Sequence, residues 1–142
     1  MSASDAANVE SKTRAVRVLL ADDTAGVRFL LRIALESVGG FSIVGEACDG
    51  AEAVELAAVH QPDVILLDMG MPIMDGLQAL PAILERSPAS KVVVLSGFSA
   101  DRLSENALSL GAAAYIEKGV AADELARRLH AIVSADDRSP IA

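Results

Sequence analysis

The sequence is poor in cysteine and in aromatic residues. Cys48 is the only cysteine, so no disulfide can form within the chain, and one cysteine with two histidines is too few for an all-protein zinc site. Tryptophan is absent and aromatic residues make up 3% of the chain, so the interior must be packed from Val, Leu, Ile and Ala. No apolar run approaches the ~20 residues that cross a bilayer. Residues 1–15 also lack an apolar stretch of the signal-peptide type. We therefore expect a cytoplasmic domain that does not enter a membrane.

Positive charge is also scarce. The chain has 12 Lys and Arg against 20 Asp and Glu, a net charge of −8, which disfavours binding to nucleic-acid phosphates. Hydrophobic residues nevertheless make up 52% of the sequence, which excludes a disordered chain. A length of 142 residues is typical of a single domain.

Short apolar segments alternate with segments of helical periodicity. The strands are expected at 16–21, 41–47, 63–68, 92–96 and 112–116, and the helices at 27–38, 49–59, from 76, 101–110 and 122–133. Such alternation predicts an α/β fold, with a single doubly wound parallel sheet and helices on both faces. We expect residues 1–14 to form a disordered extension, 15–134 the domain and 135–142 a flexible tail.

Polar side chains stand where the predicted strands end. Asp22 and Asp23 follow the first strand, Asp68 ends the third, Ser96 ends the fourth, and Lys118 comes shortly after the fifth. Ligands of such sheets bind beyond the carboxyl ends of the strands, so we expect these five side chains to converge. Three clustered carboxylates repel each other unless a cation neutralises them, and an oxygen-only ligand set suits Mg²⁺.

Carboxylates, Mg²⁺, an ammonium and a hydroxyl together make a phosphoryl-transfer site with an aspartate nucleophile. Asp68 is the best candidate, because it ends the most apolar and hence central strand. Each residue taken singly has a simpler interpretation. An Asp after a strand is often a helix cap. A lone Ser96 often only fills the strand end, and a lone Lys118 is often a solvated charge. All five at strand ends are much harder to explain in that way.

Four sequence stretches resemble the response-regulator receiver domain, the CheY-like, aspartate-phosphorylated module of two-component signalling. They are the segments 18–23, 63–76, 94–97 and 111–118, which include Asp68-Met69-Gly70-Met71-Pro72-Ile73-Met74-Asp75-Gly76. The resemblance covers about residues 15–134. It implies a flavodoxin-like fold with five helices and five strands in the order 2-1-3-4-5.

The resemblance also implies metal and acceptor roles. Asp68 is similar to the residue that accepts a phosphoryl group from the phosphohistidine of a histidine kinase or phosphotransfer protein. Asp22 and Asp23 resemble the acidic pair that holds Mg²⁺ together with Asp68 and the backbone carbonyl of Gly70.

Three further residues resemble the switch of that family. Lys118 would pair with Asp68 and then with its phosphoryl group, Ser96 would move toward the phosphoryl oxygens, and Tyr115 would follow with its ring. A partly buried ring at the end of the sheet is the other interpretation of Tyr115. The output surface would be formed by residues 101–110, 112–116 and 122–133. It would bind a downstream protein or a fused output domain, in a monomer or a phosphorylation-dependent homodimer.

The sequence departs from the family at Gly119, which follows Lys118 where receivers usually carry proline. A cis bond before a non-proline residue costs ~2.5–4 kcal/mol, so we expect a trans bond. We expect no enzyme activity beyond the domain's own phosphorylation and dephosphorylation. A haloacid-dehalogenase-type phosphatase is a less favoured alternative, because it needs an Asp two residues after the nucleophile, where Gly70 follows Asp68 and Thr24 follows Asp22. The chain is either a stand-alone receiver or a fragment of a DNA-binding regulator, which residues 41–50 resemble.

Overall fold

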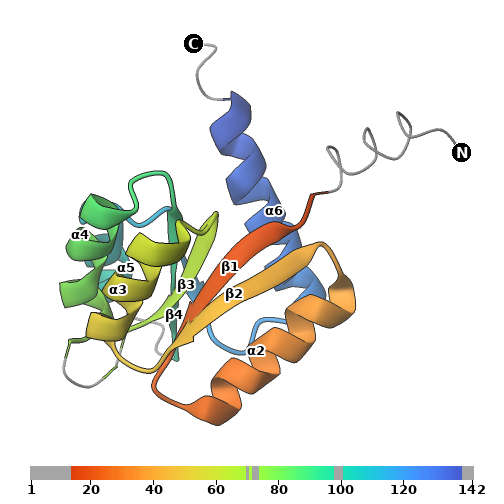
Figure 1. Ribbon diagram of the computed structural model, residues 1–142, viewed down its shortest axis with the longest axis horizontal. Helices are drawn as coiled ribbons and strands as arrows, with labels where there is room; N and C mark the ends of the chain where they lie inside the picture. The colour runs from red at the N-terminus through yellow and green to blue at the C-terminus, as the bar shows by residue number, and fades with distance from the viewer. Residues whose placement is uncertain (1–13, 70, 72–73, 98–100, 139–142) are drawn as a thin grey trace, which may run out of the picture.

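The chain folds around one five-stranded parallel sheet with the strand order β2-β1-β3-β4-β5 (Figure 1). The computed structural model describes residues 14–69, 71, 74–97 and 101–138. The strands are β1 (Val16–Ala21), β2 (Phe41–Ala47), β3 (Val64–Asp68), β4 (Lys91–Ser96) and β5 (Ala114–Glu117). Both the predicted doubly wound α/β class and the 2-1-3-4-5 order are confirmed.

Helices cover both faces of this sheet. They are α2 (Ala25–Val38), α3 (Gly50–His60), α4 (Gly76–Arg86), α5 (Asp101–Ser109) and α6 (Ala122–Arg138). Figure 1 shows α2 and α6 on one side of the sheet and α3, α4 and α5 on the other. Aliphatic side chains fill both layers: Leu35 and Leu129 pack on the first face, and Ala57 and Ile83 on the second.

β3 lies at the centre of the sheet, paired with β1 on one side and β4 on the other. All five of its residues are buried, including the terminal Asp68. A strand that is covered on both faces needs apolar side chains on both, which explains its unbroken apolar sequence. The central position places Asp68 in the middle of the carboxyl edge.

The ends of two elements differ from the prediction. α6 continues to Arg138, past the expected end at Val133, so residues 135–138 are helical. The apolar stripe that guided the prediction ends at Val133, and the helix continues because no proline or glycine interrupts it before Pro140. β5 begins at Ala114, because the N–H of Ala112 donates to the carbonyl of Ala107 and so closes α5.

The expected disordered extension falls on residues 1–13, outside the described residues, apart from Arg14. Residues 139–142 of the expected tail also lie outside them. Across the described ranges, no helix combines the length and the apolar character needed to span a bilayer.

Candidate functional site

The carboxyl ends of four adjacent strands bring the predicted residues to one edge. Asp22 and Asp23 follow β1, Asp68 ends β3, and Ser96 ends β4. Lys118 follows β5, and its backbone N–H donates to the carbonyl of Ser96 at 2.7 Å. The parallel register of β1, β3, β4 and β5 therefore converts positions far apart in sequence into neighbours.

Three carboxylates form the acidic part of this edge. One oxygen from each of Asp22, Asp23 and Asp68 lies within 4.8 Å of the others. Asp22 and Asp68 are buried, with 2% and 7% of their surface exposed, whereas Asp23 is exposed to solvent. The cluster thus has two fixed, desolvated members and one that opens to the exterior.

Lys118 bridges the two buried carboxylates. Its Nζ lies 2.9 Å from Asp68 Oδ1 and 3.1 Å from Asp22 Oδ2. Partial burial acts to lower the pKa of Lys118, but hydrogen bonds to Asp68 and Asp22 and the charges of both outweigh it. The pKa of Lys118 is therefore raised above its usual range, and the side chain stays an ammonium at neutral pH.

The remaining charge balance fits a hard divalent cation. Three carboxylates and one ammonium leave two negative charges that the described part of this edge does not neutralise. Carboxylate oxygens are ligands that Mg²⁺ accepts in a partly open site, where it keeps several waters. Asp22, Asp23 and Asp68 are the residues that could hold it. The predicted fourth ligand, the carbonyl of Gly70, lies outside the described residues.

The turn after β1 is held by main-chain contacts. Asp22 donates its N–H to the carbonyl of Ala47 at 3.0 Å, and its Oδ1 accepts the N–H of Thr24 at 2.9 Å. Arg28 Nη1 donates to the carbonyl oxygen of Asp22 at 2.6 Å. Sequence reasoning missed Arg28, because a contact between a helix side chain and a distant carbonyl leaves no periodic signal.

Gly76, at the start of α4, lies against the backbone of Asp68. A Cβ built on Gly76 would come within 2.4 Å of the Asp68 carbonyl oxygen, so only glycine permits this approach. Asp75 caps α4 by accepting the N–H of Gln78 at 2.9 Å. The Asp75-Gly76 pair belongs to the motif of residues 68–76, but its structural role could not be predicted from the sequence.

Ser96 and Tyr115 occupy neighbouring strands. Ser96 is 1% exposed and pairs in register with Glu117, while Tyr115 is half-buried and pairs with Val94. The hydroxyl therefore lies at the edge and the ring two positions further back along the sheet. Among the described residues no peptide bond is cis, so Lys118-Gly119 is trans as expected, and Gly119 has a φ of +94° that favours glycine.

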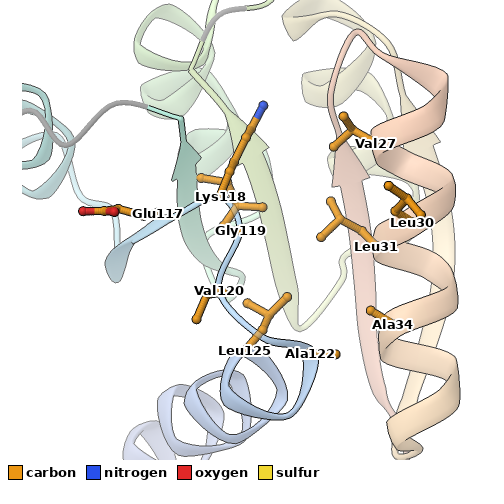
Figure 2. Close-up of a pocket in the computed structure, with 11 residues that line it drawn as sticks. Val27, Leu30, Leu31, Ala34, Glu117, Lys118, Gly119, Val120, Ala122 and Leu125 are labelled. Carbon is orange, nitrogen blue, oxygen red and sulfur yellow. The ribbon is translucent and has the colours of Figure 1, made fainter.

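An apolar groove of about 320 Å³ runs beside this edge. One wall comes from Val27, Leu30 and Leu31 of α2, and the other from the segment that leads from β5 into α6 (Figure 2). Lys118 also borders the groove, and Figure 2 shows its ammonium directed away from it. Lys118 therefore lies between the groove and the polar edge.

The fold and this edge define a flavodoxin-like α/β domain with a carboxylate and lysine site. The family model of the response regulator receiver domain matches residues 18–130. The chain therefore belongs to the receiver-domain family of two-component response regulators.

Several relatives agree with that assignment. The transcriptional regulatory protein PdtaR of Mycobacterium tuberculosis is 42% identical over 118 residues, 83% of this chain and 57% of its own length. The response regulator UvrY of Escherichia coli is 34% identical over 84% of this chain and 55% of its own length. The chain thus spans about half the length of these relatives.

Solved structures agree as well. The receiver domain of the putative response regulator NarL from Mycobacterium tuberculosis has a TM-score of 0.80 and 35% identity, covering 84% of this chain and 97% of that one. The response regulator domain of CheB from Thermotoga maritima has a TM-score of 0.79 and 32% identity, covering 85% and 98%.

Proposed function

We propose that Asp68 accepts a phosphoryl group from the phosphohistidine of a sensor histidine kinase or phosphotransfer protein. The observation that carries this proposal is the bridge of Lys118 between buried Asp68 and buried Asp22 at the carboxyl edge. A lysine held at 2.9 Å from the acceptor oxygen is also placed to pair with a phosphoryl group attached there.

The transfer is a single displacement at phosphorus. A carboxylate oxygen of Asp68 forms the new P–O bond as the P–N bond to the donor histidine breaks, and the imidazole leaves with the electron pair and takes up a proton. Asp22, Asp23 and Asp68, with the carbonyl of Gly70, would hold Mg²⁺. The bound ion would supply charge neutralisation at the phosphoryl oxygens. The chain's own catalysis is limited to its phosphorylation and dephosphorylation.

The response to phosphorylation runs through β4 and β5. The phosphoryl group adds roughly −1.5 to −2 charges at the edge. The Ser96 hydroxyl then moves toward it and Tyr115 repacks on the next strand. Because packed interiors switch between discrete arrangements, the surface of α5, β5 and α6 changes with them. A downstream protein or a fused output domain reads that surface in the cytoplasm.

The donor protein contacts the groove beside Lys118. A phosphohistidine can reach Asp68 only if its protein covers the carboxyl edge, and the groove is an apolar surface that borders Lys118 at that edge. Leu30 lines it and is 67% exposed, while Phe29 beside it is 60% exposed. Exposed apolar side chains next to a reactive edge are typical of a docking surface.

Intact mass spectrometry tests the acceptor role. The chain is incubated with a small-molecule phosphodonor and either Mg²⁺ or excess chelator, with Asp68→Asn alongside. We expect one acid-labile phosphoryl group in the wild type with Mg²⁺ and none in Asp68→Asn. Full modification of Asp68→Asn would overturn the assignment.

A further inference from the structure

Arg28, Glu46 and the main chain of Asp22 form a hydrogen-bonded cluster beside the acidic edge. Arg28 Nη1 donates to the carbonyl of Asp22 at 2.6 Å, and Arg28 Nε donates to Glu46 Oε1 at 3.0 Å. The Arg28 side chain is 16% exposed and that of Glu46 is 26% exposed. One planar guanidinium therefore ties α2 and β2 to the end of β1.

This contact fixes the peptide that joins Asp22 to Asp23. The carbonyl of Asp22 and the N–H of Asp23 lie in one rigid plane, so the direction of the carbonyl sets where the Asp23 backbone begins. Asp22 is also held at its N–H by Ala47 and at its carboxylate by Thr24 and Lys118. The hydrogen bond from Arg28 to the Asp22 carbonyl fixes the peptide group that leads to Asp23.

The Asp23 carboxylate depends on this peptide more than Asp22 does. Asp23 is exposed, and within the described residues its carboxylate accepts one long hydrogen bond, from Thr24 Oγ1 at 3.5 Å. So weak a contact does not fix the side chain. Its place within 4.8 Å of Asp22 and Asp68 follows from the backbone instead.

Glu46 explains why the Arg28 guanidinium points to a carbonyl. A partly buried cation next to three carboxylates is attracted to them, where it would compete with a metal ion. Glu46 supplies the carboxylate partner of Arg28, and it also pairs with Arg32 from the next turn of α2. Glu46 thus holds the Arg28 guanidinium outside the ligand set, and Arg28 keeps its second donor for Asp22.

We infer that Arg28, oriented by Glu46, is a positioning residue that sets the Asp22–Asp23 peptide and so determines the affinity of the acidic edge for Mg²⁺. The inference rests on the proposed function, which assigns Mg²⁺ to this edge. Lysine is a poor substitute for Arg28, because it lacks the rigid planar fork in which Nε meets Glu46 and Nη1 meets the Asp22 carbonyl.

Calorimetric titration of the full chain with Mg²⁺ tests the inference. Arg28→Lys and Arg28→Gln are compared with wild type and with Arg32→Gln, which removes a partner of Glu46 without touching Asp22. We expect about tenfold weaker Mg²⁺ binding in both Arg28 variants, the size typical of residues that orient metal ligands. The Mg²⁺ affinity of Arg32→Gln is expected to stay within about twofold of wild type, because the hydrogen bond from Arg28 to the Asp22 carbonyl remains.

A second readout does not involve the metal. In chelator, the backbone amide resonances of Asp23 and Thr24 should shift in Arg28→Lys and stay in place in Arg32→Gln. Arg28→Lys keeps the charge, so it remains informative should Arg28→Gln fail to fold.

Three outcomes would overturn the inference. The first is wild-type Mg²⁺ affinity in folded Arg28→Lys. The second is an equal loss in Arg32→Gln, which would assign the effect to the charge of the cluster. The third is a wild-type chain that binds no Mg²⁺, which would also remove the metal from the proposed function and is recognised from the wild-type titration alone.

Discussion

Lys118 reaches Asp68 across an intervening strand. β4 separates β3 from β5 in the sheet, yet the Lys118 ammonium lies 2.9 Å from the Asp68 carboxylate. The approach is possible because Lys118 lies past the end of β5, where its side chain can extend over the edge toward Asp68 and Asp22. The ion pair therefore joins the site to the part of the sheet proposed to change on phosphorylation.

Replacing Lys118 should destabilise the chain at neutral pH, and this loss should disappear at strongly alkaline pH. The raised pKa means that the ion pairs contribute fully below the unfolded-state pKa of about 10.4 and are lost as the pH rises through the folded-state value. At pH 8, in chelator, we expect Lys118→Met to lower the free energy of unfolding by about 1–2 kcal/mol. This loss is smaller than that expected for a fully buried ion pair, because solvent screens the partly exposed ammonium.

Urea unfolding at a series of pH values from neutral to strongly alkaline measures this difference. Groups that titrate in both proteins cancel when the two curves are subtracted. The difference between wild type and Lys118→Met should shrink once the pH passes the usual lysine pKa. A constant difference across the series would show that the ammonium charge is not what stabilises this edge.

The effect of Asp23→Asn on thermal stability should have opposite signs in metal-free and Mg²⁺ buffers. Without metal, the substitution removes one of three clustered negative charges, so repulsion falls and the melting temperature rises by a few degrees. With saturating Mg²⁺, the wild type gains stability through binding, about 2.7 kcal/mol at a concentration of 100 Kd, and the variant gains much less.

Differential scanning calorimetry with and without Mg²⁺ records both effects. Glu36→Gln serves as the control, since it removes an exposed carboxylate near the far end of α2. It should respond to Mg²⁺ as the wild type does. If Asp23→Asn also kept the full response to Mg²⁺, Asp23 would not be a ligand.

Gly76→Ala should disturb the loop after β3. The new methyl group would lie 2.4 Å from the Asp68 carbonyl oxygen, so the backbone of Asp68 or the start of α4 must move. We expect a loss of about 1–3 kcal/mol in the free energy of unfolding, as for other overpacked sites. Phosphorylation by a small-molecule donor should also slow.

Gly26→Ala is the matched control for that substitution. Gly26 lies in the first turn of α2, and a Cβ there would meet nothing within 4 Å. Alanine in this position should stabilise the chain by up to about 1 kcal/mol, because glycine is a poor helix former. Equal stability changes at the two positions in chemical denaturation would rule out a steric role for Gly76.

Ser96→Ala should separate phosphorylation from the response. Asp68, Lys118 and the acidic pair remain, so the variant should still accept a phosphoryl group. Its response should be smaller, since the phosphoryl group loses a contact that differs between the two states. NMR shift changes at Tyr115, the only tyrosine, are compared with and without beryllofluoride. Equal changes in wild type and variant would exclude Ser96 from the switch.

The sequence predicted which side chains meet at the carboxyl edge, because these residues follow a simple rule. Parallel strands place their carboxyl ends together, so Asp22, Asp68, Ser96 and Lys118 could be assigned to one edge from their positions alone. The apolar sequence of β3 identified the central strand for the same reason, since only a strand covered on both faces has no polar side.

The supporting contacts could not be predicted in this way. Arg28 bonds to a carbonyl and to Glu46, 18 residues away, and such contacts depend on the distance between α2 and β2, which no local pattern encodes. The need for glycine at position 76 arises from the path of the Asp68 backbone. The extra turn of α6 likewise has no large apolar side chain after Val133, so no apolar period marks it.

Localising the phosphoryl group on the polypeptide tests the central claim most directly. The chain is phosphorylated with a small-molecule donor and Mg²⁺ and reduced with borohydride, which converts an aspartyl phosphate to homoserine. The digested peptides are then sequenced by mass spectrometry, with an unphosphorylated sample as control. We predict homoserine at position 68 and at no other aspartate. Homoserine at position 22 or 23 with unmodified Asp68 would contradict the account.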